Sequence, residues 1–185
     1  RKSLGRGLSF LHSPGVLIMS DTLADAACAA SPTSMRLTSP RSAALFAAAN
    51  ALLPLLETGS PISSTQLRDV MTGAFTRSDA EGAGDWKMGY AACEAPQILL
   101  LRRYGRALAR RNPEPQRMLT ALERIAARGP THTRRSEVGQ ALQQFSTPLG
   151  LAFVAATAAM IEPGDVVLEP SAGTGMLAVH AELMR

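Results

Sequence analysis

The stretch Val166–Gly175, VVLEPSAGTG, carries the strongest fold signal in the chain. Three apolar residues end at the acid Glu169, small residues follow, and Gly173 and Gly175 precede a second apolar run. A short apolar strand, a glycine turn and a helix form the opening unit of a doubly wound α/β sheet. The stretch therefore predicts a buried strand at 166–168 and a ligand-binding loop at its carboxyl end.

The residues before this stretch predict helices. Ser39 and Pro40 suit a helix start, because serine caps the first turn and proline fits it, and Gly59 suits the end of that helix. Further helices are expected to begin near residues 63, 85, 114, 149 and 175. The fold class expected is mostly α with the beginning of an α/β, Rossmann-like domain. We expect a flexible tail over 1–38, a helical domain over 39–128 and the start of the sheet domain over 129–185.

The composition suits a protein with a packed core, since 46% of its 185 residues are hydrophobic and 18% are charged. Neither of its two cysteines has a partner at metal-ligand spacing, so we expect no metal site. No apolar run reaches the roughly 20 residues of a membrane span, so we expect no membrane association. With only two cysteines, Cys28 and Cys93, a reducing, cytoplasmic setting is expected. His180 has no acid or nucleophile at catalytic spacing and is expected to be structural.

Arginine supplies most of the net charge of +4, and it is concentrated in one segment. Residues 102–135 contain ten arginines and two glutamates, a local net charge of +8. Side chains four residues apart share a helix face, and such a block of positive charge suits double-stranded DNA. A solvated basic surface is the alternative. The candidate nucleic-acid contacts are Arg102, Arg106, Arg110, Arg134 and Arg135.

Three ligand classes use a glycine loop of this kind. A Walker-type phosphate loop needs Gly-Lys-Ser/Thr at its end, and Met176 follows Gly175 here. A dinucleotide fingerprint fits formally, but a carboxylate at Glu169 would repel a pyrophosphate. S-adenosylmethionine carries a sulfonium and an ammonium group, which tolerate a nearby acid. The loop therefore favours S-adenosylmethionine, against the alternative of a turn that binds nothing.

A second motif, Phe145-Ser146-Thr147-Pro148, lies some twenty residues before the expected strand. It resembles the Phe-x-Thr-Pro element of DNA adenine methyltransferases, in which the Thr-Pro segment holds the methionine carboxylate of the cofactor. Thr147 can donate a hydrogen bond, and Pro148 fits the start of a helix whose N-terminus favours an anion. The expected cofactor-binding residues are Phe145, Thr147, Pro148, Glu169, Pro170, Ala172, Gly173, Thr174 and Gly175.

Three further stretches, 86–94, 130–137 and 140–148, resemble the N-terminal part of bacterial strawberry-notch-like methylase–helicase fusion proteins. The resemblance covers residues 36–185 and implies methyl transfer to an adenine amino group, with a helicase-like region of the same chain as partner. The alternative function is a degenerate methyltransferase that serves as a nucleic-acid-binding or scaffolding module.

The resemblance also implies where the catalytic residues belong. Adenine methyltransferases hold the target amino group with an Asn-Pro-Pro-aromatic element, and this element does not occur in residues 1–185. We therefore expect the catalytic motif to lie beyond Arg185 and assign no catalytic residue within 1–185. The piece should consequently be inactive by itself.

Overall fold

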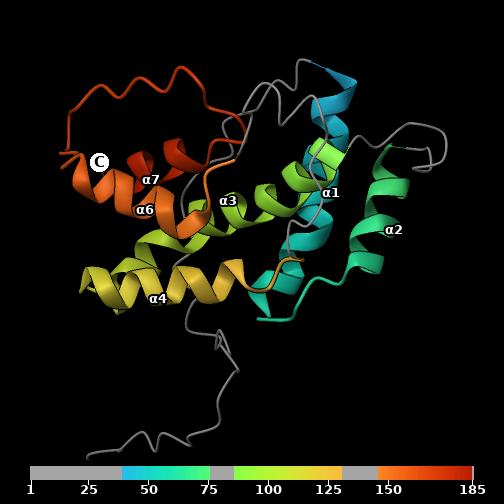
Figure 1. Cartoon of the computed structure of the whole chain (residues 1–185), viewed down its shortest axis with the longest axis horizontal. Coiled ribbons are helices and arrows are strands. Elements are labelled where there is room, and N and C mark those ends of the chain that lie inside the picture. The colour runs from blue at the N-terminus through green and yellow to red at the C-terminus, as the bar shows by residue number, and fades with distance from the viewer. Residues whose placement is uncertain (1–38, 76–85, 131–145, 185) are drawn as a thin grey trace, which may run out of the picture.

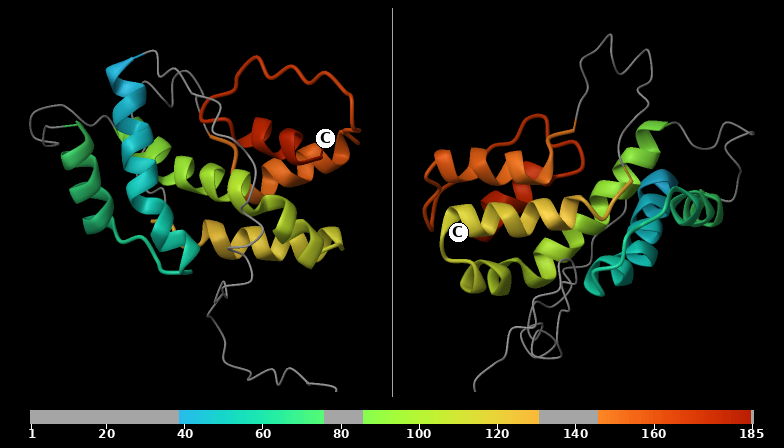
Figure 2. Two further views of the ribbon diagram at one scale, coloured as in Figure 1. Left: turned by 180° about the vertical axis from the view of Figure 1, so that it is seen from behind. Right: turned by 60° about the horizontal axis from the view of Figure 1, so that its bottom comes forward.

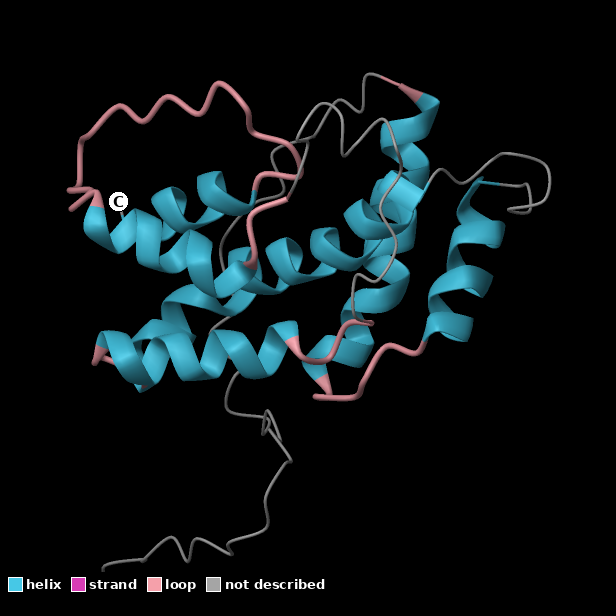
Figure 3. Cartoon of the chain, viewed as in Figure 1, coloured by secondary structure: helices cyan, strands magenta, loops and turns pink. Residues whose placement is uncertain are grey.

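In the computed structural model the chain is described over residues 39–75, 86–130 and 146–184. The described part consists of helices joined by loops and turns (Figures 1 and 3). The helices are α1 (Pro40–Glu57), α2 (Ser64–Phe75), α3 (Trp86–Arg111), α4 (Pro115–Ala126), α6 (Leu149–Ala158) and α7 (Met176–Met184).

Local sequence signals set the ends of the first two helices. The Ser39 hydroxyl accepts a hydrogen bond from the Ser42 backbone N–H at 3.1 Å and caps α1, and Gly59 follows its end at a φ of 71°. A reciprocal capping box opens α2, because the Gln66 N–H donates to the Ser63 hydroxyl and the Ser63 N–H donates to the Gln66 side chain. Both expected starts are therefore confirmed.

Helix α3 is the central element of the fold. Helices α1 and α2 pack on one part of α3, and α4 and α7 pack further along it (Figures 1 and 2). Helix α6 packs against α4 and α7. Leu101 of α3, Leu52 of α1 and Leu122 of α4 are all at most 1% exposed and belong to one apolar core. Gly105 brings α7 close, since a Cβ there would lie 2.6 Å from Leu183 Cδ1.

Polar contacts tie the end of α1 to α3. Arg103 Nη1 lies 2.7 Å from Glu57 Oε1, and the Tyr104 hydroxyl donates to the same oxygen at 3.0 Å. The pKa of Arg103 is raised, first by its hydrogen bond to Glu57. The pKa of Tyr104 is also raised, first by burial. Arg103 is half exposed, so we attribute the joining of these helices mainly to the apolar core.

The expected Rossmann-like sheet is wrong for the part of the chain that the structure describes. Residues 39–75, 86–130 and 146–184 contain no strand, and the segment 166–168 is an extended connection between α6 and α7 (Figure 3). Instead of being buried, Val166, Val167 and Leu168 are 97%, 44% and 86% exposed. A strand needs a neighbour to pair its backbone groups, and none of the described segments lies beside 166–168 as a strand. Apolar character alone therefore did not make this stretch a strand.

Candidate functional site

Helices α6 and α7 lie side by side and run in the same direction. The Phe153 and His180 rings are 5.8 Å apart, and one turn further along Thr157 and Met184 line the same cavity. The extended segment between the two helices returns the chain to the end at which α6 began (Figures 1 and 2). The N-terminal ends of both helices consequently lie at one end of the pair.

This arrangement brings the two candidate cofactor motifs together. The segment 146–148 leads into α6 and the loop 169–175 leads into α7, so the two segments are neighbours in the views of Figures 1 and 2. Helix geometry leaves the first N–H groups of each helix without an intrahelical acceptor. Both sets of donors face the same region, which therefore has two positive helix ends to offer an anionic group.

The glycine loop has the backbone shape that its sequence suggests. Gly173 and Gly175 have φ angles of 54° and 95°, a region in which residues with a side chain are strained. The Gly175 N–H donates to the Ala172 carbonyl at 2.7 Å and closes the turn before α7. The Ser171 N–H donates to Glu169 Oε1 at 3.1 Å, so the carboxylate of Glu169 is folded against its own loop.

A buried acid on α3 anchors this loop. The Thr174 hydroxyl donates to Glu94 Oε2 at 2.8 Å, a contact between residues 80 positions apart. Glu94 is only 7% exposed, and a buried carboxylate of this kind needs such partners. Sequence analysis did not assign Glu94 a role. The only signal available was an acid among apolar residues of a helix, and that signal does not say which loop the acid meets.

Four further cofactor residues expected from the sequence lie in the described part of the chain. Thr147 is partly buried, and Pro148 is the N-cap residue of α6. Pro170 and Ala172 are exposed in the glycine loop. All four therefore belong to the two segments that meet at the N-terminal ends of α6 and α7.

The flexible tail expected over 1–38 and the cofactor contact expected for Phe145 lie outside the described residues. Phe145 lies just before the described segment 146–184, and Arg185 lies just after it. The contact of Phe145 with the cofactor therefore stays a prediction. We assign no catalytic role to a described side chain.

Three of the expected nucleic-acid contacts form a row on α3. Arg102, Arg106 and Arg110 are all exposed and follow one another at four-residue spacing. Arg102 is engaged by α7, because its Nε lies 3.0 Å from Glu182 Oε2. Arg134 and Arg135 lie outside the described residues. Within this row, Arg106 and Arg110 are therefore the side chains that we expect to contact an anionic partner.

Of the helices in residues 39–75, 86–130 and 146–184, none has both the length and the apolar character required to cross a bilayer. No protein-family model, curated protein or solved structure matches the chain.

Proposed function

We propose that the loop 169–175 and the segment 147–148 bind S-adenosylmethionine, and that the chain serves the transfer of its methyl group to an adenine amino group in DNA. The observation that carries this proposal is the meeting of the two motifs at the shared N-terminal end of α6 and α7. A glycine turn alone is a weak signal, and so is a Thr-Pro helix start. Their proximity in space, with some twenty residues between them in the sequence, is independent support.

The chemistry of the region suits this cofactor. The methionine moiety carries a carboxylate, for which the N–H groups of a helix start are good partners, and Thr147 can add a hydroxyl donor. The positive sulfonium and ammonium groups suit a region that also holds Glu169. Gly173 is exposed and has no side chain, so a ligand can approach the backbone closely. We place this activity in the cytoplasm, in keeping with the resemblance to bacterial DNA methyltransferases.

Calorimetry that compares S-adenosylmethionine with NAD tests the choice of ligand. We expect saturable binding of S-adenosylmethionine and at least about tenfold weaker binding of NAD, because the pyrophosphate of NAD would meet the Glu169 carboxylate. Equal or tighter binding of NAD would contradict the proposal. Residues 1–185 contain no Asn-Pro-Pro-aromatic element, so by themselves they should bind S-adenosylmethionine but transfer no labelled methyl group to adenine-containing DNA.

A nucleic-acid-binding module is the second candidate, and the arginine row of α3 favours it. We expect the chain to bind duplex DNA with little sequence preference and with an affinity that falls as salt rises. Changing Arg106 and Arg110 to Gln should flatten the slope of log affinity against log salt by about 1.8, since each phosphate contact contributes about 0.9. Fluorescence anisotropy over a salt series measures this slope.

The matched control for this prediction changes Arg117 and Arg124 of α4 to Gln. These side chains are also exposed, and the net charge falls by the same amount, but they lie outside the α3 row. We expect the control to keep the wild-type slope. If the slope of log affinity against log salt decreased equally in both variants, only the total charge would matter. The arginine row of α3 would then not be a specific DNA-binding surface.

A further inference from the structure

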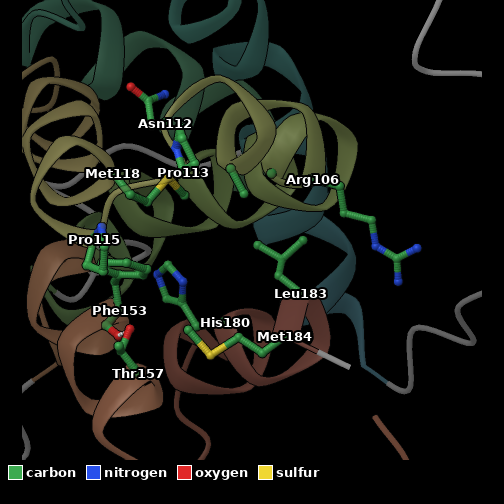
Figure 4. A pocket seen from close by; sticks show the side chains of 12 residues that line it. Arg106, Asn112, Pro113, Pro115, Met118, Phe153, Thr157, His180, Leu183 and Met184 are labelled. Carbon is green, nitrogen blue, oxygen red and sulfur yellow. Dashed lines mark hydrogen bonds between the residues drawn. The ribbon is translucent and has the colours of Figure 1, made fainter. Parts of the chain in front are cut away.

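A cavity with a volume of about 250 Å³ lies among α3, α4, α6 and α7, and no residue of the glycine loop lines it (Figure 4). Most of its lining is apolar. The side chains that supply this character are Pro113, Pro115, Met118, Phe153, Leu183 and Met184. A cavity of this size and composition suits a small apolar molecule.

One buried polar atom of this cavity has no partner among the residues that the structure describes. His180 is 1% exposed, its ring borders the cavity in Figure 4, and its Nε2 makes no hydrogen bond with them. The Nε2 atom is itself covered, so a ligand in the cavity reaches it only when a neighbouring side chain of the lining moves aside. The other polar side chains of the lining are directed elsewhere. The Asn112 amide donates to the Leu108 carbonyl at 2.9 Å, the Thr157 hydroxyl donates to the Phe153 carbonyl at 2.8 Å, and Arg106 extends away from the centre of the cavity.

The state of the His180 ring defines what its free nitrogen can bind. Burial lowers the pKa of His180 to about 4, so the ring is neutral at pH 7. A hydrogen bond with the backbone of Leu149 acts in the opposite direction and raises this pKa, as expected where the ring is the donor. Nε2 has no partner in the described part of the chain, so Nδ1 is assigned as the donor of that bond, and in this tautomer Nε2 keeps its lone pair as an acceptor.

We propose that this cavity binds a small, neutral, mostly apolar molecule with one hydrogen-bond donor, an aromatic alcohol of about the size of phenol, whose hydroxyl donates to His180 Nε2. The apolar lining covers the ring of such a ligand, and the hydroxyl satisfies the buried nitrogen. An anion would find an acceptor where it needs a donor. A cation would be placed among apolar groups without a countercharge.

Two ligands of nearly equal size test this proposal on the full chain. We expect titration with phenol, followed by NMR, to give saturable shifts at residues that line the cavity, with binding at least about fivefold tighter than that of benzene. His180→Phe should remove the preference for phenol. If the cavity holds only water, neither compound gives saturable shifts there, and the proposal fails. Equal affinity of the wild type for phenol and benzene would show that His180 Nε2 does not accept a hydrogen bond from the ligand.

A size-blocking variant keeps the proposal testable even if His180→Phe does not fold. Ala109 is exposed and lines the cavity, so Ala109→Phe should reduce phenol binding at least about tenfold. Ala155 of α6 is also exposed but does not line the cavity, and Ala155→Phe is the matched control. Wild-type binding by the Ala109 variant would place phenol outside the cavity.

Discussion

Gly175→Val should weaken the binding of S-adenosylmethionine by about tenfold or more. Gly175 has a φ of 95°, and a β-branched residue is strongly disfavoured there, so the turn before α7 must change its shape. A strain of about 1–2 kcal/mol in the binding geometry corresponds to roughly one factor of ten in affinity. Calorimetry with the same ligand and protein concentrations as for the wild type measures the change.

Gly164→Val is the matched control, because Gly164 has nearly the same backbone angle, with a φ of 98°. It lies in the turn between Glu162 and Asp165, before the exposed extended segment and outside the glycine loop. Both variants should lose similar amounts of stability, and only the Gly175 variant should lose affinity. Equal losses of affinity would show that general destabilisation, and not the loop, weakens binding.

Lowering the pH from 7 to 4 should reduce the free energy of unfolding by about 3 kcal/mol through His180 alone. The pKa of His180 is about 4 in the folded chain, against an ordinary value of 6.5. Between these values the unfolded chain takes up a proton that the folded chain does not, so stability falls as the pH falls through this window. The cause is burial, which disfavours the charged ring.

The carboxylates of the chain also titrate in this range, so the prediction concerns the difference between two proteins. His180→Phe removes the titrating group and keeps an aromatic ring beside Phe153. Urea unfolding at a series of pH values measures the free energy of unfolding of both proteins. Between pH 7 and pH 4 this free energy should fall by about 3 kcal/mol less in the variant than in the wild type. Parallel curves for the two proteins would mean that His180 does not stay neutral in the folded chain.

The helices could be predicted from the sequence because their signals are local. The serine cap before Pro40, the capping box at Ser63 and the glycine after α1 act within a few residues and do not depend on the rest of the fold. The helix expected to begin near residue 149 is likewise confirmed as α6.

The segment 166–168 shows where such reasoning fails. An apolar triplet becomes a buried strand only when neighbouring strands pair with it, and that condition depends on other parts of the chain. The described segments supply no such neighbour, so the same residues form an exposed connection.

In the candidate site, too, the local features could be predicted from the sequence and the long-range contacts could not. The turn-forming role of Gly173 and Gly175 is a local property, and their positive φ angles agree with it. The Thr174–Glu94 contact joins residues 80 positions apart, and the environment of His180 Nε2 depends on four helices packing around it. Neither feature has a signature in sequence spacing.

Cys93 is a free cysteine of α3, next to Glu94, and it is only 2% exposed. Its reactivity therefore reports how often the helices packed on α3 separate from it. Burial and the neighbouring Glu94 raise the pKa of this thiol to about 12, so at pH 8 only about one molecule in 10⁴ carries the reactive thiolate. An alkylating reagent can modify Cys93 at an appreciable rate only after α3 has separated from the helices packed on it. When the other cysteine is removed by Cys28→Ser, the rate at which Cys93 is alkylated measures how often this helical core opens. A ligand that holds the Glu94–Thr174 contact in place should lower this rate.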